Sequence, residues 1–145
     1  MLILDPKDGI RFGNCKELND FYREIGCDCI DIARRTVGGK MFDIFVDDEG
    51  LLKADAGDRI SAIAEEDGKL SPQLVGTLVF ANHDAAGNTT DLTLDDTMLI
   101  ASRVKRIVIE NRETGEKRAN YCIVLDPVKR LDAADFAAWL GGEKT

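Results

Sequence analysis

The stretch CDCIDIARRTVGGKMFDIFVD, residues 27–47, decides the fold class of this chain. It has two halves, residues 27–37 and 41–47, that are rich in β-branched and aromatic residues and lie on either side of Gly38-Gly39. Within each half, apolar side chains recur at every second position, which is the period of a strand with one buried face. Two glycines favour a tight turn, so the stretch predicts an antiparallel hairpin.

A helix is expected immediately before this hairpin. Asn14 is placed to cap its first turn together with Glu17, and Gly26 is suited to end it in the left-handed conformation. The apolar residues that recur at helical spacing are Leu18, Phe21, Tyr22 and Ile25. This stripe predicts one face packed on the core.

After the hairpin the pattern alternates between short elements and polar turns. Residues 59–65 are expected to form one short turn of helix, and the apolar run 74–82 a single buried central strand. Gly76 inside that run indicates a bulge or a close backbone approach. Thr93 starts a short capped helix that runs to about Arg103.

Two elements are expected near the end of the chain, over residues 104–140. Strands 104–110 and 121–126 form a second hairpin, and residues 131–140 form a last helix. We therefore predict one α+β domain, residues 1–145, with a mainly antiparallel sheet and helices packed on it. One parallel pairing in the middle stays open.

The composition limits the function classes. The 145 residues carry 27 Asp+Glu against 19 Lys+Arg, a formal charge of -8, which disfavours a long grip on nucleic-acid phosphates. No apolar run has the roughly 18–20 residues that a membrane helix needs, and the first residues lack the basic charge of a signal peptide. We expect a cytoplasmic protein with no direct nucleic-acid binding and no membrane partner.

Neither the cysteines nor the acidic residues form a recognisable metal motif. In a reducing compartment the cysteines are expected to stay free and structural. They are Cys15, Cys27, Cys29 and Cys122. The Asp47-Asp48-Glu49 triplet matches no calcium-loop spacing and is interpreted as a solvated acidic turn. We predict no metal and no cofactor.

The candidate ligand site combines basic residues from both hairpins. Residues 101–118 carry six Lys+Arg against three Glu, whereas residues 41–100 carry 13 Asp+Glu against three Lys+Arg. Arginine forks suit phosphate, and amide or hydroxyl side chains suit a sugar or base. The expected ligand-binding residues are Arg34, Arg35, Lys40, Asn82, His83, Thr89, Thr90 and Arg106. The alternative is that these are solvated charges on hairpin faces.

Catalytic residues are not predicted. His83 is the single histidine, so a general base near neutral pH is either this residue or a perturbed carboxylate. A lone histidine at a strand end is more often a surface turn residue. No nucleophile elbow surrounds it, which favours a protein that is not an enzyme.

Several runs of the chain together resemble the domain of unknown function 3846 family. They are residues 26–35, 38–44, 47–53, 74–80 and 91–93. Asp47-Asp-Glu-Gly-Leu-Leu-Lys53 is the most specific of them, and the resemblance covers residues 26–97. It implies a setting in phages, plasmids and other mobile elements of bacteria, and therefore in the bacterial host cytoplasm, without a settled activity.

Three hypotheses for function follow. The first is a non-enzymatic accessory protein of a phage or mobile element that binds and sequesters a small phosphorylated nucleotide signal of host defence. The second is an acidic protein–protein effector or DNA mimic that inhibits a host enzyme. The third, ranked last, is a metal-dependent hydrolase or nuclease that uses Asp47, Asp48, Glu49 and His83. In the first case exposed hairpin edges would permit a homo-oligomer, with pockets formed between subunits.

Overall fold

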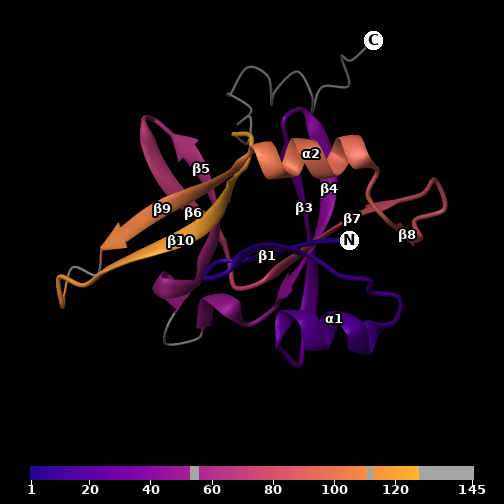
Figure 1. The fold of residues 1–145 in the computed structure, drawn as a ribbon, viewed down its shortest axis with the longest axis horizontal. Coiled ribbons are helices and arrows are strands. Elements are labelled where there is room, and N and C mark those ends of the chain that lie inside the picture. Colours follow the sequence, from indigo (N-terminus) through magenta and orange to yellow (C-terminus); the bar gives the residue numbers. More distant parts are fainter. Residues whose placement is uncertain (53–55, 111–112, 128–145) are drawn as a thin grey trace, which may run out of the picture.

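The computed structural model describes residues 1–52, 56–110 and 113–127 (Figure 1). The strands are β1 (Leu2–Asp5), β2 (Gly9–Phe12), β3 (Ile30–Val37), β4 (Lys40–Asp47), β5 (Ile60–Glu66), β6 (Lys69–Val75), β7 (Leu78–His83), β8 (Thr89–Thr90), β9 (Val104–Glu110) and β10 (Lys117–Val124). The helices are α1 (Leu18–Ile25) and α2 (Leu94–Ser102), with short 3-10 turns η1 (Gly50–Leu52) and η2 (Ala56–Arg59). The α+β class is confirmed.

The described strands form two sheets. The larger has the order β2-β1-β7-β4-β3, with β8 extending it beside β7, and the smaller has the order β6-β5-β10-β9. Their pairings are antiparallel except for the one between β5 and β10, which is parallel. The expected hairpins are present as β3–β4 and β9–β10, and the mainly antiparallel pairing is confirmed.

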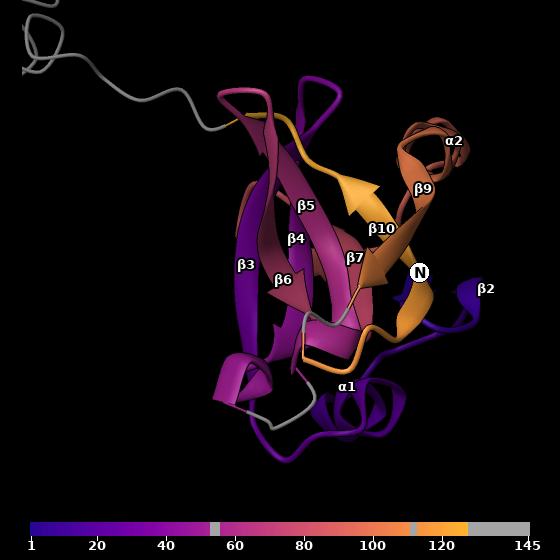
Figure 2. The ribbon, with the colours of Figure 1, turned by 90° about the vertical axis from the view of Figure 1, so that its left-hand side faces the viewer.

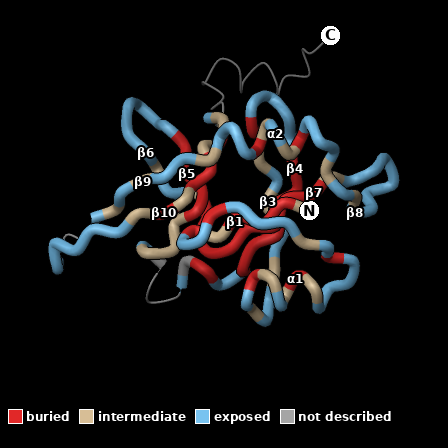
Figure 3. Tube along the Cα trace, in the orientation of Figure 1, coloured by how far each residue is buried: buried red, intermediate tan, exposed pale blue. Residues whose placement is uncertain are grey.

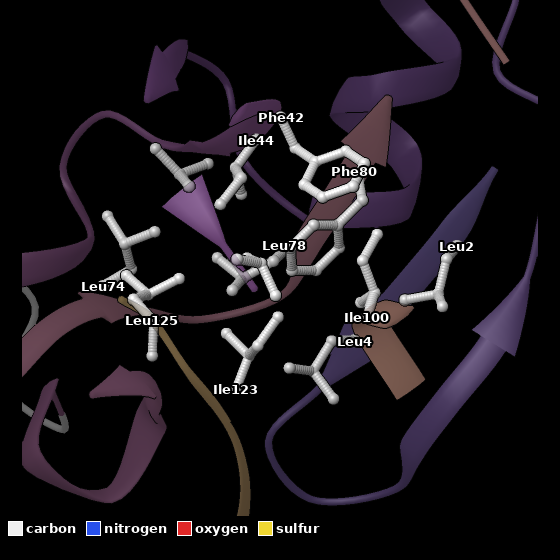
Figure 4. Packing of buried hydrophobic residues seen from close by; sticks show 13 residues of the cluster. Leu2, Leu4, Phe42, Ile44, Leu74, Leu78, Phe80, Ile100, Ile123 and Leu125 are labelled. Carbon is white, nitrogen blue, oxygen red and sulfur yellow. The ribbon is translucent and has the colours of Figure 1, made fainter. Parts of the chain in front are cut away.

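The principal core lies between the two sheets. Figure 2 shows β5 and β6 stacked in front of β3, β4 and β7, and Figure 4 shows side chains from both sheets meeting. Phe42 of β4, Phe80 of β7 and Ile123 of β10 are all fully buried there, together with Ile100 of α2. Figure 3 shows the exposed residues concentrated at the hairpin ends.

A second buried cluster lies on the opposite face of the larger sheet. The ring of Phe21 in α1 stacks on that of Phe45 in β4, with centroids 4.1 Å apart, and Ile25 is buried beside them. Gly26 ends α1 in the left-handed conformation, as expected. The expected cap at Asn14 is wrong. Glu17 is the N-cap and forms a capping box with Asp20, because the helix begins one turn later.

The apolar run 74–82 is two strands in different sheets, so the single central strand expected there is wrong. Gly76 has φ +80°, and its amide donates to the carbonyl of Arg59 at 2.7 Å. β6 ends in the smaller sheet before this turn, and β7 begins in the larger sheet after it. The residues on both sides of Gly76 are apolar because both strands end or begin in the core. The same apolar run is therefore compatible with one long buried strand and with two buried strands.

The expected helical turn over residues 59–65 is also wrong, because β5 occupies this segment between β6 and β10. Ser61, Ala62, Ile63 and Ala64 are buried, which is the environment of a central strand. Strands β1 and β2 had no predicted counterpart. The helix expected over residues 131–140 lies outside the described residues.

Helix α2 begins and ends as predicted. Thr93 accepts the Asp96 amide and the Asp96 carboxylate accepts the Thr93 amide, which is a complete capping box. Neither described helix is long and apolar enough to cross a membrane.

Candidate functional site

Three of the predicted ligand-binding residues lie in a polar cluster under α2. The Asp96 carboxylate, only 4% exposed, accepts hydrogen bonds from Nδ2 of Asn82 at 2.7 Å and from the Thr93 amide at 3.0 Å. It also forms an ion pair with Nζ of Lys40. Thr90 of β8 pairs with Asn82 across the strands. The charge of Lys40 is therefore already balanced within the chain.

Asp96 is held in its ionised form by this cluster. Burial alone would raise the pKa of Asp96, but the hydrogen bonds from Lys40, Thr93 and Asn82 outweigh it and hold the pKa well below its ordinary value. The cluster thus fixes the start of α2 to β4 and β7. This role is structural.

Another predicted pair lies on the opposite face of the larger sheet. The Asp43 carboxylate, buried to 3% exposure, contacts Nδ1 of His83 at 3.0 Å and accepts from Nε of Arg34 at 3.2 Å. Side chains alternate along a strand, so Asp43 shares the face of Phe45, whereas Lys40 shares the face of Phe42. The predicted residues on β3, β4 and β7 are therefore divided between two faces.

The remaining predicted residues, Thr89, Arg35 and Arg106, form no hydrogen bond or ion pair with Asp43 or Asp96 among the described residues. Thr89 pairs with His83 across the β7–β8 strands, and Arg35 donates to the carbonyl of its neighbour Arg34. Arg106 lies on β9 in the smaller sheet, whereas Arg34 and Arg35 lie on β3 at the far edge of the larger one. The structure does not bring the basic residues of the two hairpins together.

Arg106 instead lines a groove of about 700 Å³ at the seam between the two sheets. The walls come from the β1–β2 turn, η2, the β6–β7 junction at Gly76, and strands β9 and β10. The basic residues around it are Lys7, Arg59, Arg106 and Arg118, and the acidic ones are Asp5 and Asp58. The sequence-based site contains only Arg106 from this set.

Hydrogen bonds between distant segments hold the walls together. Nδ2 of Asn120, a residue only 4% exposed, donates to the carbonyls of Asp58 at 2.9 Å and Ile60 at 3.1 Å. The amide of Tyr121 donates to the carbonyl of Pro6 at 2.8 Å, which joins the β1–β2 turn to β10. Hydrogen bonds to the backbone therefore fix the positions of the segments that line the groove.

The acidic side chains of the groove are engaged locally. Oδ1 of Asp5 accepts the amides of Lys7 at 2.8 Å and Asp8 at 3.2 Å, and its Oδ2 lies 3.6 Å from Arg11. Oδ2 of Asp58 lies 3.9 Å from Arg118. Both carboxylates therefore have partners that compete with any further ion pair.

Three basic side chains of the groove have no carboxylate partner among the described residues. In the described part of the chain, Lys7, Arg59 and Arg106 form no ion pair. Unpaired guanidinium groups around a hollow favour an anion. The one signal of this site in the sequence was Gly76, for which a bulge or a close backbone approach was expected. In the structure the Arg59 side chain lies against it. No local pattern indicated Lys7.

The cysteines and the acidic triplet add no metal motif. None of the four cysteines forms a disulfide, and Oδ1 of Asp47 accepts the amide of Glu49 at 3.0 Å. Within the described ranges, no group of three or more His, Cys, Asp or Glu side chains is placed to hold a metal ion.

Comparison with known proteins gives one result that bears on identity. A search of curated proteins and a search of solved structures find no match. The family model described as Domain of unknown function (DUF3846) matches residues 1–105, a longer segment than the resemblance over residues 26–97. It spans β1 to α2 and the first residues of β9, so Lys7 and Arg59 lie inside it and Arg106 just beyond it. The chain belongs to the DUF3846 family, a domain of unknown function.

Proposed function

We propose that this protein binds a small phosphorylated ligand of nucleotide size in the groove between its two sheets. The observation that carries the proposal is the convergence of Lys7, Arg59 and Arg106, all without an ion-pair partner in the described chain, on one hollow. A protein with a net charge of -8 that still places unpaired cations around a groove offers a local site for an anion.

The groove suits a ligand with an anionic end and a less polar body. Its volume of about 700 Å³ is in the usual range for small-molecule sites, roughly 300–1,000 Å³. The Arg59 and Arg106 guanidinium groups are planar donors that match phosphate oxygens in pairs. Pro6, Thr77 and Ala119 supply apolar and hydroxyl contacts beside them.

Binding without turnover is the activity that these residues support. Sequestration requires affinity and a preformed site. The hydrogen bonds of Asn120 and Tyr121 hold the walls of the groove in place, which provides a preformed site. In the mobile-element setting that the family resemblance implies, such a protein would remove a phosphorylated signal of host defence from solution.

Isothermal titration calorimetry tests this function. The probes are AMP, ADP and cyclic AMP, with adenosine as the uncharged control and inorganic phosphate as the fragment control. We expect saturable binding of the phosphorylated probes and none of adenosine. Arg59→Ala and Arg106→Ala should each weaken binding about tenfold or more, since a hydrogen bond to a charged group contributes roughly 1.5–3 kcal/mol.

Arg23→Ala is the matched control. Arg23 is an exposed arginine of α1 that pairs with Asp20 outside the groove, so its removal should leave the affinity unchanged. Equal affinity in wild type, Arg59→Ala and Arg106→Ala would contradict the proposed site. Absence of binding to every phosphorylated probe, together with a bare mass in native mass spectrometry of protein purified from bacteria, would contradict the function.

A further inference from the structure

Strands β5 and β10 separate from each other beside the groove. Their parallel pairing begins only at Ala62 with Ile123, and the earlier residues of β10 pair with β9 alone among the described strands. Figure 1 shows the β9–β10 hairpin diverging from the β5–β6 hairpin toward its own turn. The groove lies at this opening, which has Arg59 on the β5 side and Ala119 on the β10 side.

The hydrogen bonds of β10 show which of its backbone groups point into the opening. β9 and β10 pair without a bulge, so successive residues of β10 point alternately toward β9 and away from it. The Tyr121 amide points away from β9, because it donates to the carbonyl of Pro6, and the Leu125 amide follows the same alternation by donating to the carbonyl of Ile63. Ala119 precedes Tyr121 by two residues, so its N–H and C=O also point away from β9, toward the groove that it lines.

Both of these backbone groups of Ala119 are open. The residue is half-buried, and its N–H and C=O form no hydrogen bond with any other described segment. Backbone polar groups in a partly enclosed site are normally satisfied by protein, water or ligand. The wall of the groove therefore presents one donor and one acceptor side by side.

The open stretch of β10 is too short to accept a peptide strand. On one side of Ala119 the Tyr121 amide is already bound to Pro6, and on the other side Lys117, the next residue of the same orientation, lies outside the groove lining. A phosphate is disfavoured at Ala119 as well, because the carbonyl would face its oxygens. A planar group with a donor next to an acceptor matches the pair, and the Watson–Crick edge of a nucleobase has this form.

We propose that Ala119 binds the base of a nucleotide through its backbone, while the basic side chains of the groove hold the phosphate. This inference rests on the proposed function and narrows the ligand from a phosphorylated molecule to a nucleotide with a free Watson–Crick edge. For AMP, the Ala119 carbonyl accepts from the amino group of adenine, and the Ala119 N–H donates to the adjacent ring nitrogen. Pro6 and Thr77, which also line the groove, supply apolar surface for the ring.

Isothermal titration calorimetry with three phosphorylated ligands tests the base contact in the wild-type protein. AMP has the free edge, etheno-AMP keeps the phosphate and the rings but has its amino group and ring nitrogen blocked by an etheno bridge, and ribose phosphate has no base. AMP should bind at least about tenfold more tightly than either of the others, because it alone forms both hydrogen bonds with Ala119.

Two proline variants locate the contact at Ala119. Ala119→Pro removes the N–H that faces the groove and leaves the ladder with β9 complete, because that N–H takes no part in it. Val108→Pro is the matched control, because Val108 lies directly opposite Ala119 and its N–H points to the far edge of β9, outside the groove lining. Ala119→Pro should weaken AMP binding at least about threefold and leave ribose phosphate binding unchanged, whereas Val108→Pro should change neither.

The failure of this inference can be told apart from the failure of the proposed function. Equal affinity of the wild type for AMP and etheno-AMP, or an equal loss of AMP and ribose phosphate binding in a folded Ala119→Pro, would overturn the base contact and leave the phosphate site standing. Binding of none of the phosphorylated ligands would overturn both. Circular dichroism checks the fold of each variant, and if Ala119→Pro does not fold, the three ligands with the wild type still decide.

Discussion

The guanidinium of Arg59 lies directly against Gly76. A Cβ placed on Gly76 would be 2.7 Å from Nη2 of Arg59, closer than two such atoms can approach. Gly76 also has φ +80° and donates its amide to the Arg59 carbonyl. The glycine that moves the chain from one sheet to the other therefore also makes room for an arginine of the groove.

Substitution of Gly76 by alanine is expected to affect stability and the groove together. Alanine at this positive φ should lower the unfolding free energy by about 1–2 kcal/mol, and its Cβ should displace the Arg59 side chain. Gly26→Ala is the control, because Gly26 has φ +74° and nothing within 4 Å of its Cβ position. Urea unfolding should show both variants destabilised, and calorimetry should show weakened phosphate-ligand binding in Gly76→Ala alone. Equal affinities in the two variants would show that Arg59 does not need this position.

Substitution of Asp96 by asparagine is expected to loosen α2. At neutral pH it removes the charge that pairs with Lys40 and leaves one acceptor oxygen where the carboxylate has two, at a cost of about 2 kcal/mol. The pKa of Asp96 is lowered in the folded state, so its contribution is present above the unfolded-state pKa and is lost as the pH falls toward the folded-state pKa. The difference from wild type should therefore shrink below about pH 4.

Urea unfolding at pH 7 and pH 3 measures this difference. Asp95→Asn is the control, because Asp95 is an exposed residue in the same first turn of α2. Its effect should stay within about 0.5 kcal/mol at both pH values. A destabilisation by Asp96→Asn that is the same at both would contradict the stabilising role of the ionised carboxylate.

The thiols are expected to differ sharply in reactivity. Burial raises the pKa of Cys122 to about 11, and its Sγ lies 3.2 Å from the carbonyl of Ile60. Burial, aided by Glu24, also raises the pKa of Cys15, whereas Cys29 is exposed. Iodoacetamide labelling followed by peptide mass spectrometry should modify Cys29 first and reach the other two only in denaturant. Rapid native labelling of Cys122 would show that β10 opens readily.

The contact of α1 with the larger sheet depends on Phe21. Phe21→Ala removes the ring that stacks on Phe45 in a buried cluster and should lower the unfolding free energy by about 3–4 kcal/mol. Leu18→Ala on the same helix is the control, because Leu18 is 55% exposed and should cost under about 1 kcal/mol. Chemical denaturation of both variants gives the two unfolding free energies. Equal decreases in the two variants would contradict the packing of α1 on the sheet through Phe21.

Several elements were predictable because their signals are local. The β3–β4 hairpin follows from alternation around Gly38-Gly39, and α2 follows from the Thr93 cap. Gly26 was identified as the end of α1 for the same reason, since a left-handed residue suits glycine. Each of these depends on residues close together in the chain.

The candidate site was not predictable in this way. Lys40, Arg34 and His83 have the composition of a ligand site, but their partners Asp96 and Asp43 are contributed by other elements. The sequence does not reveal which carboxylate will pair with a given basic side chain, because ion pairing depends on distances in the folded chain.

The sequence by itself determined the hairpins, the end of α1, the start of α2 and the α+β class, because backbone propensity, alternation and capping act over a few residues. Only the tertiary structure decided that residues 74–82 divide between two sheets and that β5 is a central strand. The same long-range pairings bring Lys7, Arg59 and Arg106 to one groove. Residues far apart in the chain meet there because burying both sheet faces requires the chain to cross between them at Gly76.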